Sequence, residues 1–195
     1  MAWTQPPELR GRHVRLVALA PEHAERLVPI IDLEHFKYFL AVRPFSADLE
    51  GAQTYVSLML QERNVMPFVV EDLTTGRLVG MSSYMDIREA HRALEIGMTW
   101  IAPEVRGTSV NPEMKYLMLR HAFEEFGAIR VQLKTDGRNL HSQAAIRKLG
   151  AKYEGTWRKH GIQPNGFVRD TVMFSILDDE WPDVKAGLER RLKIP

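Results

Sequence analysis

Seven segments of the chain are strand-like. The clearest, residues 129–135, alternates between hydrophobic and polar positions, and this period of two is typical of strands. The predicted strands are residues 12–19, 67–71, 77–85, 93–101, 129–135, 152–160 and 167–176. The turn Pro164-Asn165-Gly166 between the last two strands predicts a hairpin. Tyr153 and Trp157 in the sixth strand could line a binding cleft, although aromatic residues in strands more often belong to the core.

Apolar residues spaced three and four apart predict two helices between the first and second strands. One begins near Pro21, and the other is capped by Ser46. The apolar stripe of the second helix consists of Leu49, Ala52, Val56, Met59 and Leu60.

The most apolar helix is predicted over residues 112–126, with Asn111 as its cap and Gly127 as its terminator. It is apolar on two faces, which indicates a central helix that other elements cover on both sides. Shorter helices are expected at residues 140–149 and within residues 178–195.

Length and composition agree with one α/β (α+β) domain. No repeat or linker divides the 195 residues, so residues 1–195 are expected to form a single domain with residues 1–10 as an N-terminal lead. The net charge of +1 argues against a nucleic-acid binder, and the lack of cysteine excludes disulfides and a cysteine nucleophile. Because no apolar leader and no run of ~20 apolar residues is present, we expect a cytoplasmic protein without a membrane partner.

Motifs of several well-known enzyme classes are absent from the sequence. GxGxxG, GxxxxGK[ST], GxSxG and HExxH do not occur. The seven histidines are scattered, and none pairs with another at metal-ligand spacing, so no metal site is expected. Dinucleotide-dependent oxidoreductases, nucleotide hydrolases and zinc hydrolases are therefore disfavoured.

The turn before the central helix has the composition of an anion-binding site. Gly107 lets the backbone approach a ligand closely, and Thr108 and Ser109 have small side chains. Successive backbone amides at a helix N-terminus favour an anion such as a pyrophosphate. The same residues also fit an ordinary capped loop, so the spacing alone leaves both interpretations open.

Three motifs follow one another in the order found in a known enzyme family. Residues 104–109 correspond to the loop pattern Gln/Arg-x-x-Gly-x-Gly/Ala, in which Gly107 matches, whereas Glu104 and Ser109 depart from it. The segments Asn139-Leu-His-Ser142 with Ile146-Arg-Lys-Leu-Gly150, and Arg158-Lys-His160 with Arg169-Asp170, come next. On these residues the chain, from about Leu9 to its C-terminus, resembles the Gcn5-related N-acetyltransferases (GNAT), most closely the RimJ/RimL-type branch of ribosomal-protein N-terminal alanine acetyltransferases.

The resemblance implies a mixed, mostly antiparallel sheet that is flanked by helices and splayed between its fourth and fifth strands. Acetyl-CoA would enter this split as the co-substrate. Its pantetheine would pair with the fourth strand and contact Asn139, and its pyrophosphate would lie on the amides of residues 106–111. The implied cofactor-binding residues are Thr99, Trp100, Ile101, Arg106, Gly107, Thr108, Ser109, Val110, Asn111, Asn139 and Ser142.

Acetyl transfer to an amine needs a base for the amine and a proton for the leaving thiolate. Glu95 lies on the strand where several family members place a base that acts through water, although a solvated strand carboxylate is an equally good interpretation. Ser142 matches the serine that is proposed to protonate the thiolate in the RimJ/RimL-type branch, and it could also take part in capping with Asn139. His160 ends the sixth strand and is the third catalytic candidate, or a surface histidine.

The leading hypothesis is an acetyl-CoA-dependent N-acetyltransferase that works by direct attack in a ternary complex. An α-amine with a pKa near ~8 is roughly 10% neutral at pH 7, whereas a lysine near ~10.4 is neutral about once in 2,500. A site without an obvious strong base therefore favours a peptide N-terminus or a small primary amine of low pKa. The alternatives are a small-molecule amine acetyltransferase and a catalytically weak acyl-CoA-binding module; a homodimer is compatible with all three. The acceptor cleft is expected near residues 32–45 and 158–168.

Overall fold

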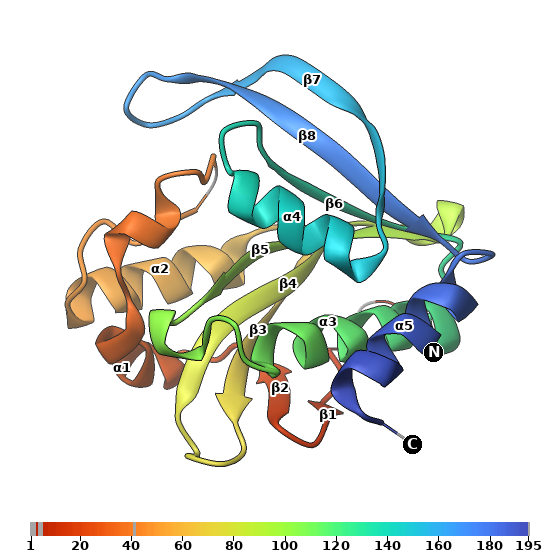
Figure 1. Ribbon diagram of the computed structural model, residues 1–195. Coiled ribbons are helices and arrows are strands. Elements are labelled where there is room, and N and C mark those ends of the chain that lie inside the picture. Colours follow the sequence, from red (N-terminus) through yellow and green to blue (C-terminus); the bar gives the residue numbers. More distant parts are fainter. Residues whose placement is uncertain (1–2, 4–5, 41, 195) are drawn as a thin grey trace.

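The computed structural model describes residues 3, 6–40 and 42–194, and in this part of the chain it has one mixed eight-stranded sheet (Figure 1). The order of the strands is β1-β2-β3-β4-β5-β6-β8-β7. The strands are β1 (Leu9–Arg10), β2 (Val14–Ala18), β3 (Val65–Asp72), β4 (Leu78–Arg88), β5 (Ala93–Ile101), β6 (Arg130–Asp136), β7 (Lys152–Ile162) and β8 (Val168–Leu177). The seven predicted strands are confirmed. Within the predicted lead, β1 is additional, because two residues are too few to show a period; residues 1–2 and 4–5 lie outside the described part.

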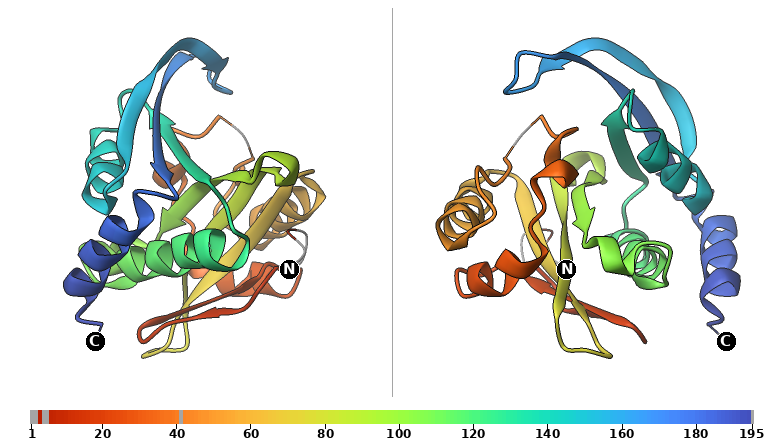
Figure 2. Two further views of the ribbon diagram at one scale, coloured as in Figure 1. Left: turned by 90° about the vertical axis from the view of Figure 1, so that its right-hand side faces the viewer. Right: turned by 60° about the vertical axis from the view of Figure 1, so that its left-hand side comes forward.

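Helices cover both faces of the sheet (Figures 1 and 2). They are α1 (His23–Leu27), α2 (Leu49–Gln61), α3 (Val110–Arg120), α4 (Leu140–Leu149) and α5 (Trp181–Leu192), with a 3-10 turn at Val28–Ile30 after α1. One hydrophobic core joins α1 and α2 to the sheet, and the other joins α3, α4 and α5 to the opposite face. Within the described ranges, every helix is too short or too polar to span a lipid bilayer.

Two predicted details of α2 are wrong. Its cap is Asp48, whose carboxylate accepts a hydrogen bond from a backbone amide, and the Ser46 hydroxyl donates to that carboxylate over 2.7 Å. Leu49 and Leu60, the two ends of the predicted stripe, are 45% and 43% exposed, whereas Tyr55 is buried. The ring of Tyr55 reaches the hydrophobic core between α2 and the sheet, whereas the two leucines lie outside this core.

The sheet divides where β5 meets β6. This pair is parallel, while the other neighbouring strands are antiparallel, and it comprises only Ala93↔Arg130, Leu94↔Val131 and Glu95↔Gln132. Beyond Glu95 the two strands diverge, and Figure 1 shows β4 and β5 leaving β6, β8 and β7 as two separate half-sheets. The split predicted between the fourth and fifth strands is confirmed, since these strands are β5 and β6.

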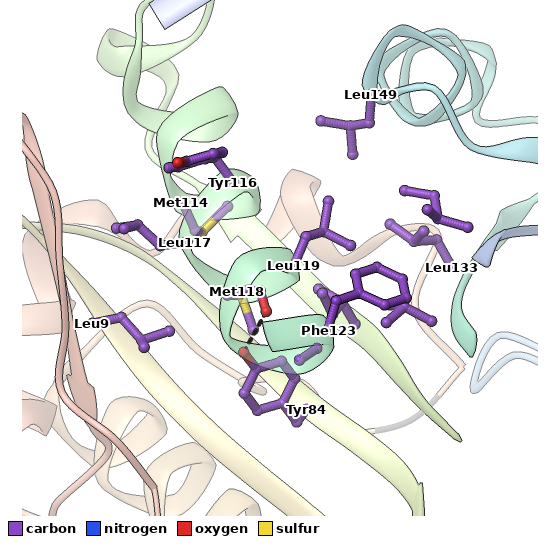
Figure 3. Close-up of a cluster of buried hydrophobic side chains, with 14 of the residues drawn as sticks. Leu9, Tyr84, Met114, Tyr116, Leu117, Met118, Leu119, Phe123, Leu133 and Leu149 are labelled. Carbon is purple, nitrogen blue, oxygen red and sulfur yellow. Dashed lines mark hydrogen bonds between the residues drawn. The ribbon is translucent and has the colours of Figure 1, made fainter. Parts of the chain in front are cut away.

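Helix α3 packs against both half-sheets. Its residues Leu117 and Met118 belong to the core that α3 shares with the half-sheet of β1 to β5. The Tyr84 hydroxyl of β4 donates to the Met118 carbonyl over 2.6 Å (Figure 3). On its other side Leu119 faces Leu133 of β6, which explains the two apolar faces. The predicted cap is wrong, because α3 already begins at Val110, so that Asn111 lies inside its first turn.

The end of the central helix also differs from the prediction. The last turn, His121–Glu125, is π-helical, and the Phe126 amide donates to the His121 carbonyl over 3.0 Å. The predicted helix over residues 112–126 is therefore an α-helix followed by this wider turn. Gly127 follows with a φ of +67°, as expected for a residue that terminates a helix.

The β7–β8 hairpin curves over the split (Figures 1 and 2). Its tip is tied to the segment after α1, because Gln163 donates to the Lys37 carbonyl over 2.8 Å and Arg169 donates to the Tyr38 carbonyl over 2.7 Å. The expectation that Tyr153 and Trp157 belong to the core is wrong, since they are 56% and 49% exposed. They lie on β7, which is an edge strand of the sheet.

Candidate active site

Among the strands that the structure describes, none pairs with one edge of β5 from Ile96 onward. Over this stretch β5 keeps its pairing with β4, while its pairing with β6 ends at Glu95. A bulge interrupts the β4–β5 ladder here, and Met98 at the bulge has a φ of +50°. The free backbone groups of this edge can pair with an extended ligand that carries amides of its own.

The turn that follows β5 leads into the N-terminus of α3. Gly107 has a φ of +77°, and a Cβ atom at this position would meet no atom within 4 Å. Among the described residues, the backbone hydrogen bonds do not use the amides of Gly107, Ser109 or Asn111. The Val110 amide differs, because it donates to the Thr108 hydroxyl over 3.2 Å. Three free amides at a helix N-terminus fit a diphosphate.

Two charged residues flank this turn. Arg106 is exposed and could meet an anion on the turn. Glu104 is also exposed, and its carboxylate lies 4.0 Å from the guanidinium of Arg77, which precedes β4. The carboxylate of Glu104 is thus paired with Arg77, a residue that lies outside the turn around Gly107.

The side chains of the three predicted strand residues bond or pack within the protein, while their backbone lies on the free edge of β5. The Thr99 hydroxyl accepts a hydrogen bond from Lys115 over 2.6 Å. The Trp100 indole is buried and donates to the Tyr55 hydroxyl over 3.1 Å. Ile101 is half-buried and packs against the core around α3.

Asn139 and Ser142 lie at the start of α4, which follows β6. Asn139 is the N-cap of this helix, and its side-chain oxygen accepts a hydrogen bond from the Ser142 amide over 3.1 Å. The Ser142 hydroxyl is half-buried and makes no hydrogen bond within the described part of the chain. The capping interpretation is therefore confirmed for the backbone of Ser142, and its hydroxyl stays available.

Glu95 is buried at the apex of the split, with an exposed fraction of 1%. Its Oε2 atom accepts a hydrogen bond from Gln132 over 3.1 Å and lies 2.9 Å from the ammonium of Lys134. Its Oε1 atom lies against Gly97, where a Cβ atom would approach it to 2.9 Å. The interpretation of Glu95 as a solvated carboxylate is wrong, because β6 lies beside it and supplies both partners.

His160 belongs to the same polar region. Its Nδ1 atom lies 3.0 Å from the Thr171 hydroxyl, and its ring contacts that of Trp157. His160 is exposed, as the interpretation as a surface histidine expects. Desolvation of its ring, and after it the cations Lys134 and Arg169, lower the pKa of His160, while Glu95 opposes this shift. The split thus brings the first and third catalytic candidates, far apart in sequence, into one electrostatic environment.

The comparisons with known proteins agree with this geometry. Residues 13–152 match the family model described as "Acetyltransferase (GNAT) domain". The chain belongs to the GNAT acetyltransferase family.

Individual relatives match this acetyltransferase over most of its length. The chain is 30% identical to "Putative ribosomal N-acetyltransferase YdaF" of Bacillus subtilis (strain 168), over 90% of this chain and 97% of that protein. It is 28% identical to "FsC-acetyl coenzyme A-N(2)-transacetylase" of Aspergillus fumigatus, over 90% of this chain and 78% of that protein. A crystal structure described as a "putative acetyltransferase" from T. thermophilus is 38% identical, with a TM-score of 0.90, and the match covers 98% of this chain and 100% of that chain.

Several polar residues of the acetyltransferase site were missed by sequence reasoning. Lys134 and Gln132 occupy the polar positions of β6, whose alternation predicted the strand but not the face that meets Glu95. Asp136, at the end of β6, is buried and pairs with Arg138 over 2.7 Å. The described residues contain no group of three His, Asp or Glu side chains arranged as metal ligands.

Proposed function

We propose that this acetyltransferase moves the acetyl group of acetyl-CoA to a primary amine by direct attack in a ternary complex, with an α-amine at a protein or peptide N-terminus as the favoured acceptor. The observation that carries this proposal is the position of Glu95 at the apex of the split, where the free edge of β5 begins, with the free amides of the α3 N-terminus following the far end of that strand. Acetyl-CoA can lie along the free edge of β5 while the acceptor amine contacts the Glu95 carboxylate.

The backbone would bind the donor at two places. The amides of Gly107, Ser109 and Asn111 would hold the diphosphate, and the free edge of β5 would pair with the amides of the pantetheine arm. Asn139 would contact that arm through its amide group, whose oxygen already caps α4. Bound acetyl-CoA supplies a thioester carbonyl as the electrophile.

Two side chains would move protons. Glu95 takes a proton from the acceptor amine through a water molecule, so that the nitrogen lone pair attacks the acetyl carbon. As the new C–N bond forms, the C–S bond breaks and the electron pair stays on sulfur. The Ser142 hydroxyl gives its proton to this thiolate and regains one from water. Water also takes up the second proton, which the nitrogen loses as it becomes an amide. Direct attack is preferred because the sequence has no cysteine that could carry the acetyl group.

The charges around Glu95 bear on the acceptor. Lys134 already pairs with the carboxylate, so Glu95 assists an amine that is partly neutral at pH 7 more readily than one that is fully protonated. This favours an α-amine over a lysine side chain. The name of the Bacillus relative agrees with a ribosomal-protein acceptor, while that of the Aspergillus relative keeps a small-molecule amine as the second candidate.

The acceptor class can be tested by measuring CoA release. The wild-type chain is incubated with acetyl-CoA and a peptide that begins with alanine or serine, with the same peptide blocked at its N-terminus, or with spermidine. Release with the free peptide but not the blocked one supports the proposal. Release only with spermidine shows a small-molecule enzyme, and binding of acetyl-CoA without release for any amine shows a binding module.

A further inference from the structure

Lys115 is a buried lysine without a carboxylate partner among the described residues. It lies on α3 with an exposed fraction of 5%, and no ion pair involves it. Its ammonium donates to the Thr99 hydroxyl over 2.6 Å and lies 3.4 Å from the Ser82 hydroxyl. Burial lowers the pKa of Lys115 to about 7. Lysine is rarely buried without a pair, so its retention here needs a reason.

The Thr99 hydroxyl belongs to the bulge in β5, and the Ser82 hydroxyl lies opposite it on β4. Gly97 pairs with Ser83 and Trp100 pairs with Met81, so Ser82 alone faces two residues, Met98 and Thr99. The Ser82 and Thr99 hydroxyls are 2.8 Å apart and join β4 to β5 where a ladder pair is missing. Lys115, which lies on α3, connects this pair of hydroxyls to the helix.

The hydrogen-bonded group of Ser82, Thr99 and Lys115 links the two parts of the proposed donor site, the free edge of β5 and the turn before α3. Met98 and Thr99 lie on the free edge that would hold the thioester end of the donor, and α3 begins at the turn that would hold the diphosphate. A backbone with a positive φ at a non-glycine residue persists only where its surroundings hold it, and Met98 is such a residue. An apolar side chain in place of Lys115 could fill the space but could not bond to the hydroxyls.

We propose that Lys115 is a positioning residue for acetyl transfer: together with Ser82 and Thr99 it fixes the bulge of β5 against α3, and so aligns the thioester with the acceptor. This inference rests on the proposed function. Lys115 acts through Thr99 and the strand backbone rather than on the reacting atoms. Its effect is therefore on turnover, because small misplacements of a reacting group cost far more rate than binding.

The test compares Lys115→Met, Thr99→Val and Thr99→Ser with the wild type. Turnover is followed as CoA release with the best acceptor of the panel, and CoA affinity is measured by calorimetry. Lys115→Met is expected to lower kcat at least ~10-fold and to change the Kd of CoA less than about threefold. Thr99→Val should lower kcat to the same extent, and Thr99→Ser should have a kcat close to that of the wild type. The double variant that combines Lys115→Met with Thr99→Val should lose no more kcat than either single variant.

Glu113→Gln is the matched control. Glu113 is also buried on α3, but its carboxylate binds the backbone amides of Arg12, His13 and Val14, away from the bulge. The control is expected to lower thermal stability and to leave kcat within twofold. Equal kcat losses in Lys115→Met and Glu113→Gln would overturn the inference, because the loss would then be a general effect of a weakened α3.

The other outcomes of this experiment each support or overturn the role of Lys115. A folded Lys115→Met variant with wild-type kcat contradicts the inference. If that variant does not fold, the Thr99 pair decides: a loss in Thr99→Val with rescue in Thr99→Ser supports the inference, and wild-type kcat in Thr99→Val overturns it. A wild-type chain that releases no CoA with any amine contradicts the proposed function itself, and the inference falls with it.

Discussion

Glu95 and Gln132 are the last pair of the parallel ladder between β5 and β6, and the Gln132 amide donates to the Glu95 carboxylate over 3.1 Å. Backbone register and a side-chain hydrogen bond thus fix the same carboxylate at the point where the sheet divides. Lys134, two residues further along β6, neutralises its charge. The candidate base is therefore held by the sheet and not by a loop, which limits its movement during turnover.

Glu95→Gln is expected to lower kcat by about 10²–10³-fold, because the amide cannot accept the proton. The loss should shrink as the pH rises, since the acceptor amine then deprotonates without help. Steady-state CoA release across the pH range checks this. Glu71→Gln is the matched control, because Glu71 is also an ion-paired strand carboxylate, bound to Arg15 and Arg26 far from the split. An unchanged kcat in Glu95→Gln would remove Glu95 as the base.

Ser142→Ala is expected to lower kcat by a similar factor with little change in CoA affinity, because protonation of the thiolate is needed only in the transition state. The cap of α4 should survive, since Asn139 bonds to the backbone amide of residue 142. Unlike Glu95→Gln, this variant should recover little at high pH. If both variants keep near-normal kcat, the assignment fails and His160→Gln becomes the next test.

Gly107→Val should raise the Kd of CoA at least ~10-fold, equivalent to about 1.4 kcal/mol, because a side chain at this position projects into the proposed diphosphate site. Gly76→Val is the matched control. Both glycines have a positive φ, +77° at Gly107 and +66° at Gly76, and open space around the Cβ position, so a valine is strained at either position. Calorimetry should show wild-type affinity for the control. Equal weakening in both variants would place the diphosphate elsewhere.

Folding stability should depend on pH through Lys115. Its pKa of about 7 in the folded chain lies below the ordinary value of 10.5, so between these values the unfolded chain binds a proton that the folded chain lacks. Raising the pH through this window therefore stabilises the fold, by at most about 1.4 kcal/mol per pH unit. Denaturant unfolding at pH 7, 8 and 9 should show the wild type gaining stability relative to Lys115→Met. A constant difference would mean that Lys115 keeps an ordinary pKa.

Local patterns predicted most of the fold. The strand Ala93–Ile101 and the helix Leu140–Leu149 have the predicted boundaries, because alternation and helical spacing are properties of neighbouring residues. The cap at Asp48 was missed because Ser46 and Asp48 are both good capping residues, and only the geometry of the turn chooses between them. The exposure of Trp157 was missed because a strand pattern does not reveal that β7 is an edge.

The candidate site was predicted less completely. The resemblance gave Glu95 as a candidate base, but its burial and its contact with Lys134 depend on the register between two strands that are far apart in sequence. Lys115 carries no signal in the sequence, because a lysine in a helix is normally exposed and only the packing of α3 under the bulge buries it.

A crystal structure of the chain with CoA and a peptide that has a free N-terminus tests the central claim most directly. The account predicts the diphosphate on the amides of Gly107, Ser109 and Asn111, the pantetheine along the free edge of β5, and the sulfur beside Ser142 with the peptide amine facing Glu95. CoA bound outside the split, or a peptide amine remote from Glu95, would contradict it.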